Sequence, residues 1–330
     1  DEEWSVVLIG VPVVKDVGWL VCGCLFFFLM IRRPPRSTQG GSSAASDVYK
    51  GQSRHLPVVL ITNPDRPRGR SGTPQAPPIT GLARRLGVAV EQPEHLSDPE
   101  GLRTLLAHAP DVLVVCAYGQ IVRRPVLAAV ETIVVHPSLL PRWRGAAPVE
   151  RALLAGETEL GVCTLRMTEG LDEGPVGDVR RVHVPREADA GRAYELLAPA
   201  AVTGVLATLD ALVRGTVNWR AQEGEATYAA KIGPDDKEID WSRPAVAIAD
   251  QIRALSPHIG AVTRLGGRRT RIWRASPGSG PLPAPGPDRL VIAAGEGWVD
   301  VHELQQEGRT RLTVAEFLRG AGRGLVTPRP

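Results

Sequence analysis

The sequence predicts an α/β domain with a doubly wound parallel sheet, followed by a smaller domain with a β-barrel. Between residues 56 and 215, β-branched apolar runs alternate with segments of helical periodicity, which is typical of strand–helix–strand units with right-handed crossovers. Between residues 261 and 304, short apolar runs are separated by Gly- and Pro-rich turns, which favours a small barrel. The 330 residues are enough for two hydrophobic cores.

The composition is that of an ordinary globular protein, with 43% hydrophobic and 23% charged residues and a formal net charge of +3. Charge alone therefore does not indicate a nucleic-acid-binding protein. No Gly-x-Gly-x-x-Gly follows a strand and no Gly-x-x-x-x-Gly-Lys occurs, which disfavours nicotinamide and ATP enzymes. The cysteines have neither paired metal-ligand spacing nor a disulfide framework, which favours a reducing compartment and no zinc site. They are Cys22, Cys24, Cys116 and Cys163.

The first 55 residues do not follow the α/β pattern. The uncharged run at 17–31 has fifteen residues, and a membrane span needs about twenty. A signal anchor is the alternative interpretation of this run, but no basic segment precedes it. Residues 20–52 resemble translated sequencing-adapter read-through, so we expect them to be foreign and to replace a native strand–turn–helix unit. Ser5–Gly10 is interpreted as a remnant of the first strand.

From His55 onward the boundaries of the α/β elements are well marked. Gly87, Gly156 and Gly215 stand where helices are expected to end, and Pro148 stands where one is expected to begin. The strongest strand, 111–116, is a continuous apolar run and indicates a buried parallel strand. The predicted strands are 56–62, 88–90, 111–116, 132–135 and 162–167, the predicted helices are 80–86, 98–107, 148–155 and 189–214, and a basic Gly/Pro loop covers 63–72.

A polar connector at 222–233 separates the α/β domain from the second domain. We place the first domain at 56–215, the linker at 216–235 and the second domain at 236–325. From residue 251 to 330 there are twelve Arg, no Lys and six acidic residues, an excess of six positive charges that is compatible with an RNA backbone. A solvated basic face is the simpler alternative. The second domain is predicted to have helices at 244–255 and 313–318 and strands at 261–265, 270–275, 290–294 and 298–304.

Two titratable residues are placed where catalysis is expected. His136 follows the strand 132–135, and in open α/β sheets ligands bind beyond the carboxyl ends of the strands. Asp172 lies in a Gly-flanked loop at 170–174, after the next apolar segment. Taken singly, each has a simpler interpretation, as a hydrogen-bonded strand-end histidine and a turn-forming aspartate. Together they form a plausible acid/base pair.

Three short motifs carry a family resemblance. They are His-x-Ser-Leu-Leu-Pro at 136–141, Trp-Arg-Gly-Ala-Ala-Pro at 143–148 and Gly-Leu-Asp-x-Gly at 170–174. In this order and spacing they resemble the folate-dependent formyltransferases, and with Arg142 before the second motif the string is most similar to methionyl-tRNA formyltransferases. The segment 227–241 resembles the linker and second-domain entry of those enzymes.

The resemblance implies a Rossmann-like formyltransferase fold followed by an OB-type barrel. It implies 10-formyltetrahydrofolate as co-substrate, initiator methionyl-tRNA as acceptor, and no metal. We therefore expect a monomeric, cytoplasmic enzyme of bacterial-type translation initiation that makes no membrane contact.

The resemblance also implies roles for individual residues. His136 would shuttle protons and, as imidazolium, hold the oxyanion, while Asp172 would orient the imidazole. The folate pocket would be lined by Ala117, Tyr118, Gly119, Ser138, Leu139, Leu140 and Pro141.

One position departs from the family. Two residues before His136, where formyltransferases carry an Asn as oxyanion donor, this chain has Val134, which cannot donate a hydrogen bond. Loss of one such donor costs roughly 10²–10³ in kcat. A water or backbone N–H replaces the amide, the enzyme is weak, or the sequence contains an error at this position.

The loop at 63–72 carries Arg66, Arg68 and Arg70. In the family this loop enters the acceptor end of the tRNA, and Arg70 matches its key arginine. Arginine suits bidentate phosphate contacts and stacking on bases. A solvated basic loop is the alternative.

Three functions are open at this point. The first is methionyl-tRNA formylation. The second is formylation of a sugar nucleotide or of glycinamide ribonucleotide on the same fold, against which stand the arginine loop and the second domain. The third is a catalytically impaired relative that binds tRNA or folate, which Val134 and the atypical N-terminus keep open.

Overall fold

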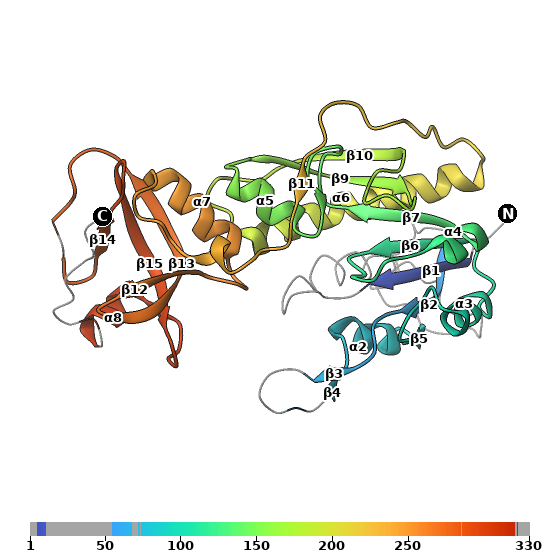
Figure 1. Cartoon of the computed structure of the whole chain (residues 1–330), viewed down its shortest axis with the longest axis horizontal. Helices are drawn as coiled ribbons and strands as arrows, with labels where there is room; N and C mark the ends of the chain where they lie inside the picture. The colour runs from blue at the N-terminus through green and yellow to red at the C-terminus, as the bar shows by residue number, and fades with distance from the viewer. Residues whose placement is uncertain are drawn as a thin grey trace, which may run out of the picture. The chain divides into compact units, whose positions relative to one another are not determined.

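The computed structural model describes residues 5–10, 55–67, 72, 74–284, 286–320 and 322 (Figure 1). The chain forms two compact units that do not follow its linear order. The first unit comprises residues 1–144, 161–182 and 195–226, and the second comprises 145–160, 183–194 and 227–330. We describe each unit separately.

The main sheet has seven strands in the order β10-β9-β7-β6-β1-β2-β5 (Figure 1). The pairs from β7 through β6, β1 and β2 to β5 are parallel, as predicted for a doubly wound α/β fold. Strand β9 pairs antiparallel with β7, which the sequence analysis did not anticipate. The strands are β1 Ser5–Gly10, β2 Leu56–Ile61, β5 Ala89–Glu91, β6 Val112–Cys116, β7 Glu131–His136, β9 Glu159–Arg166 and β10 Val176–His183.

Strand β1 lies between β6 and β2, with Val6 opposite Val112 and Leu8 opposite Leu60. The prediction that Ser5–Gly10 is the first strand is therefore confirmed. The segment 20–52, expected to be foreign, lies outside the described residues.

The helices of the α/β part are α2 Pro78–Arg85, α3 Pro99–Leu106, α4 Arg124–Ala129, α5 Pro148–Leu154 and α6 Ala190–Val213. Four of them match predicted helices, and α4 was not predicted. The loop at 63–72 was predicted to have no strand. That prediction was wrong for residues 66 and 67, because β3 Arg66–Pro67 pairs with β4 Pro74–Gln75. The pairing joins residues on either side of the loop, which local turn signals do not reveal.

Helix α6 is long and apolar enough to cross a membrane by length and composition alone. Its contacts are those of a core helix. Leu197, Val205 and Leu209 are fully buried, whereas Leu206 and Leu212 are only half-buried. Thr208 Oγ1 lies 2.6 Å from Thr164 Oγ1 on β9, so the helix packs on the sheet.

The second unit contains a five-stranded antiparallel sheet in the order β12-β13-β15-β14, with β16 paired to β15 (Figure 1). The predicted small β domain is confirmed, and its assignment as an OB fold stays a prediction. The elements are β11 Tyr228–Ala229, α7 Ala245–Leu255, β12 Ala261–Leu265, β13 Arg268–Gly278, β14 Leu290–Ala293, β15 Trp298–Gln306, β16 Leu312–Thr313 and α8 Val314–Arg319.

Within the second unit, the buried Arg253 side chain of α7 contacts the end of α5. Arg253 on α7 donates to Asp250 Oδ1 at 2.7 Å, and both side chains are less than 10% exposed. The same guanidinium donates to the carbonyl oxygen of Leu153, in the last turn of α5, at 3.4 Å and to that of Glu157, just after the helix, at 3.2 Å. Helix ends leave carbonyl groups without intrahelical donors, and here a side chain of α7 supplies them. Hydrogen bonds from a charged side chain therefore tie α7 to the end of α5.

Candidate active site

Strand β7 delivers His136 to the carboxyl edge of the main sheet. Five consecutive residues, from Thr132 to His136, are buried, as expected for a strand covered on both faces. Immediately beyond, the chain turns back, because the Ser138 amide donates to the His136 carbonyl at 2.9 Å and Ser138 Oγ donates to the Arg142 carbonyl at 2.7 Å. The histidine therefore sits in a closed loop with little freedom.

Both imidazole nitrogens of His136 face acceptors. Nδ1 lies 3.5 Å from Asp172 Oδ2, and Nε2 lies 2.8 Å from the carbonyl oxygen of Trp143. A carbonyl oxygen only accepts, so Nε2 carries the proton in this contact. The predicted pairing of His136 with Asp172 is present, and the ring is held from both sides.

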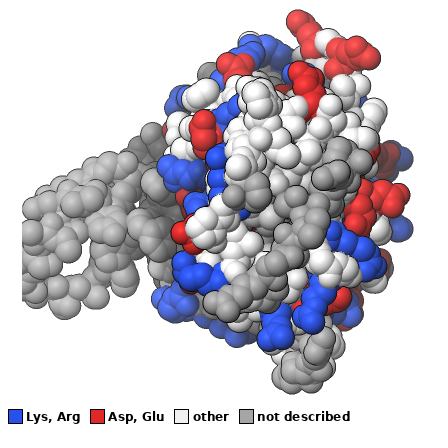
Figure 2. All heavy atoms as spheres, turned by 90° about the vertical axis from the view of Figure 1, so that its left-hand side faces the viewer, with Lys and Arg blue, Asp and Glu red and all other residues white. Residues whose placement is uncertain are grey.

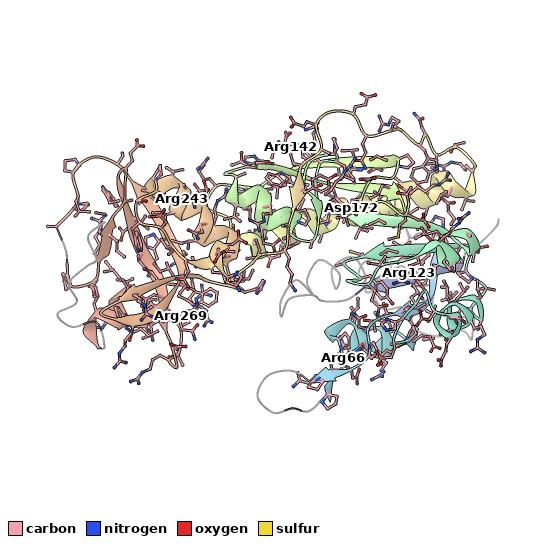
Figure 3. All side chains as sticks on the ribbon, in the orientation of Figure 1. Arg66, Arg123, Arg142, Asp172, Arg243 and Arg269 are labelled. Atoms are coloured by element: carbon pink, nitrogen blue, oxygen red, sulfur yellow. The ribbon has the colours of Figure 1, made fainter. Side chains whose placement is uncertain are left out.

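Asp172 is held in an unusual backbone conformation near the end of β7 (Figure 3). Its φ is +52°, in the left-handed region that non-glycine residues rarely adopt. Two residues on, a Cβ at Gly174 would lie 1.7 Å from the Arg166 carbonyl oxygen, so only glycine fits there. These constraints keep the carboxylate mostly buried, although the neighbouring Leu171 is 60% exposed.

Gln222 and Arg144, to which the sequence analysis assigned no role, hold the Asp172 loop by hydrogen bonds. The Gln222 amide donates to the carbonyl oxygens of Asp172 and Gly174, and the Arg144 guanidinium donates to the Gln222 side-chain oxygen. Arg144 belongs to a motif whose letters alone do not reveal this contact. Gln222 is 50 residues from Asp172, and nothing in its local sequence marks it.

The segment Ala117 to Gly119 follows β6, the neighbour of β7. Ala117 has φ +47° and Gly119 has φ +75°, so the chain bends sharply here. Tyr118 is 2% exposed, and its hydroxyl is a buried group without a hydrogen-bond partner among the described residues. Burial raises the pKa of this phenol above its ordinary value of 10.0, so the hydroxyl is a potential donor.

Val134 points into the same apolar cluster as Tyr118. It is buried, pairs across β7 with Val115 and Leu165, and shares this cluster with the partly buried Leu140. Leu140, a predicted pocket residue, and Val134, at the position of the missing amide, thus belong to the same apolar cluster as Tyr118.

The segment Ser138 to Pro141 forms part of the loop that follows His136. Ser138 and Pro141 are buried, whereas Leu139 and Leu140 are partly exposed. Leu139 packs so closely on Gly161 that a Cβ there would lie 2.2 Å from the leucine methyl. This loop is therefore fixed against β9.

The basic loop is only partly described. Arg66 is exposed, forms an ion pair with Glu94 and lies on β3, well away from Asp172 (Figure 3). Arg68 and Arg70 lie outside the described residues.

Comparisons with known proteins identify the family. A family model described as formyl transferase matches residues 38–209, and one described as formyl transferase, C-terminal domain, matches residues 231–322. The methionyl-tRNA formyltransferase of Symbiobacterium thermophilum is 40% identical over 279 residues, which cover 81% of this chain and 86% of that protein. The chain belongs to the methionyl-tRNA formyltransferase family. The enzyme of that name from Desulfotalea psychrophila is 38% identical over 283 residues, covering 82% of this chain and 87% of the relative.

Solved structures of formyltransferases share the fold. The methionyl-tRNA formyltransferase from Clostridium thermocellum superposes with a TM-score of 0.52 at 15% identity, covering 83% of this chain and 93% of that one. HypX from Aquifex aeolicus, solved in complex with tetrahydrofolic acid, superposes with a TM-score of 0.63 at 16% identity, covering 100% of this chain and 49% of that one. At these identities the likeness supports the formyltransferase fold and no more.

Proposed function

We propose that this formyltransferase moves the formyl group of 10-formyltetrahydrofolate to the amino group of initiator methionyl-tRNA. The observation that carries the proposal is the His136–Asp172 pair at the carboxyl edge of the sheet. It occurs in a chain whose relatives at 38% to 40% identity bear the name methionyl-tRNA formyltransferase. No observation favours a sugar nucleotide or glycinamide ribonucleotide as acceptor.

The reaction needs a group that can both take and give a proton. The attacking amine loses a proton as it adds to the formyl carbon, the carbonyl oxygen becomes an oxyanion, and the folate N10 takes up a proton as it leaves. For this transfer, His136 Nε2 exchanges the Trp143 carbonyl for the substrate, takes the amine proton and passes it to N10, while Asp172 beside Nδ1 orients the ring and stabilises its positive form. Such a positioned acid/base contributes about 10²–10⁴ in rate. These proton transfers require no metal ion.

The folate substrate is assigned to the surface made by residues 117–119 and 138–141. Leu140 supplies apolar surface, and the buried Tyr118 hydroxyl is a donor without a partner in the described chain. A pterin has an apolar face that suits Leu140 and polar edge atoms that suit the Tyr118 hydroxyl once binding uncovers it. Binding sites of this kind are mostly apolar with a few placed polar groups.

The second unit supplies a basic surface for the tRNA. Arg264, Arg268 and Arg271 on the β12–β13 hairpin are exposed, and none forms an ion pair with a carboxylate in the described part of the chain. Arg264 stands directly opposite Arg269 in the strand register, and Arg269 donates to Glu238 Oε1 at 3.2 Å, so the positive charge of Arg264 is the one left for a phosphate. Figure 2 shows Lys and Arg side chains mainly around the margins of the face that it draws, and Figure 3 labels Arg269 on the second unit.

Arg66, Arg68 and Arg70 form the second proposed tRNA contact, at the acceptor end. The enzyme acts as a monomer in the cytoplasm and makes no membrane contact. Phosphate contacts of this kind weaken steeply as salt rises.

The experiment measures formyl transfer from 10-formyltetrahydrofolate to methionyl-tRNA, an amino-sugar nucleotide and glycinamide ribonucleotide, each at saturation. We expect transfer to methionyl-tRNA alone, and a fall of about 10²–10⁴ in kcat for His136→Ala. Preferred transfer to either small acceptor would overturn the substrate assignment. No transfer to any acceptor, with folate or tRNA binding retained, would identify an impaired binding protein.

A further inference from the structure

Asp172 depends on its surroundings for its position. A non-glycine residue in the left-handed region is strained, and such strain persists only where neighbouring groups over-determine the conformation. If the loop relaxed, the carboxylate would leave the imidazole of His136. Some group outside the loop must therefore hold it.

The Gln222 side chain makes the required contacts. Its Nε2 donates to the carbonyl oxygen of Asp172 at 2.7 Å and to that of Gly174 at 2.9 Å. The first acceptor belongs to the strained residue itself. An amide nitrogen has two N–H groups, and both are used on the loop.

Arg144 fixes the direction of this amide. Its Nη2 and Nε donate to Gln222 Oε1 at 2.8 Å and 3.1 Å, and its Nη1 donates to Glu173 Oε1 at 3.3 Å. A guanidinium only donates, so the amide cannot flip without losing all four contacts. Residues 172, 173 and 174 are thus each held by one of two side chains.

The segment that carries Gln222 is itself attached to the sheet. It links α6 to β11 and passes beside β10, where Arg220 and Val176 exchange backbone hydrogen bonds of 3.0 Å and 2.7 Å (Figure 1). Gln222 is therefore presented from a fixed backbone, two residues beyond this bridge.

A second glutamine in the chain shows what is particular about the first. Gln251 Nε2 also donates to two carbonyl oxygens two residues apart, Asp236 at 2.8 Å and Glu238 at 3.0 Å. Its Oε1 is buried without a partner among the described residues, so no guanidinium orients it. Both glutamines brace a loop, but only Gln222 braces one that carries a proposed catalytic carboxylate.

We propose that Gln222, oriented by Arg144, is a positioning residue for formyl transfer, which acts by holding the Asp172 carboxylate against His136. This rests on the roles proposed above for His136 and Asp172. Gln222 has no contact with the reacting atoms. Its removal is expected to lower kcat about 10- to 100-fold, because misplacing a catalytic group by about 1 Å costs up to about 10²-fold, and to change KM less than about 3-fold.

The test is a double-mutant cycle. Formyl transfer is measured for the wild-type protein, Gln222→Leu, Asp172→Asn and the double variant, with rates corrected for the folded fraction. If Gln222 acts through Asp172, the Leu substitution lowers kcat in the wild-type background and has less than about a 2-fold effect in the Asp172→Asn background. Equal losses in both backgrounds, or no loss in the wild-type background, would overturn the proposal.

Two further variants sharpen the result. Gln222→Glu keeps an acceptor for Arg144 but presents a second acceptor to the two loop carbonyls, so we expect it to be as impaired as Gln222→Leu. The matched control Gln251→Leu removes the same pair of backbone contacts elsewhere, and we expect its kcat per folded molecule to be unchanged. Failure of the proposed function would appear separately, as no loss of kcat for Asp172→Asn itself.

Discussion

Restoring an amide at position 134 is the sharpest test of how this site stabilises negative charge. Val134 lies two residues before His136 on β7, so both side chains leave the same face of the strand. Val134→Asn places a hydrogen-bond donor on that face. We expect kcat for methionyl-tRNA to rise.

The substitution is expected to raise the catalytic rate and to lower the free energy of unfolding. A well-placed oxyanion donor contributes about 10²–10³ in kcat, or about 2.7–4 kcal/mol in the transition state. Burying an amide in the apolar cluster around Val134, which is 9% exposed, lowers the free energy of unfolding by about 1–3 kcal/mol if the amide lacks a partner. That loss is smaller than the typical stability of about 5–15 kcal/mol, so the variant folds.

The assay is single-turnover formyl transfer with enzyme in excess of methionyl-tRNA, which isolates the chemical step, combined with urea unfolding of each variant. Val134→Thr is the control, because it has nearly the same shape and its hydroxyl is shorter than an amide. We expect an increase of at least about 10-fold for Asn, below the full value of one donor, and less than about 2-fold for Thr.

An unchanged or lower rate in folded Val134→Asn would refute the assignment of this position to the oxyanion. Equal gains for Asn and Thr would point instead to a general loosening of the cluster.

Three other predictions follow from the structure. Arg253→Ala leaves the buried Asp250 without its main partner and is expected to lower the free energy of unfolding by about 3–5 kcal/mol, measured by urea titration, whereas replacing both with Met and Leu recovers most of it. Burial raises the pKa of the Glu150 carboxyl above its ordinary value of 4.5. The protonated carboxyl therefore contributes its full stability below pH 4.5, and this contribution is lost as pH rises through the raised pKa of the folded protein. Glu150→Gln should reduce this loss of stability with rising pH, measured by unfolding experiments across pH. Arg70→Ala is expected to raise KM for methionyl-tRNA without changing KM for the folate, and equal changes in both would refute its role.

The sequence predicted the elements whose signals are local. Pro148 begins α5 and glycines with positive φ follow α2, α5 and α6, as the letters indicate. Strand β10 was missed because its residues from Val176 to His183 alternate in burial with charged positions and lack a continuous apolar run. The antiparallel direction of β9 was missed because direction is set by the path of the chain between strands.

In the candidate site, too, features with a local sequence signal could be predicted and features set by the fold could not. The pairing of His136 with Asp172 could be predicted, because a strand end and a family motif mark each residue. The backbone strain at Asp172 could not be predicted, because the sequence around an aspartate does not reveal whether its φ is positive. The hydrogen bonds from Gln222 span 50 and 48 residues, so only the fold reveals them.

The contact of α7 with the end of α5 has a consequence for synthesis of the chain. Arg253 is made 100 residues after Leu153, whose carbonyl oxygen it serves. At about 5–20 residues per second the ribosome needs about 5–20 s to cover that distance. Throughout that interval the carbonyl oxygens of Leu153 and Glu157 lack the Arg253 guanidinium, so a chain cut short before residue 253 is left without this contact at the end of α5.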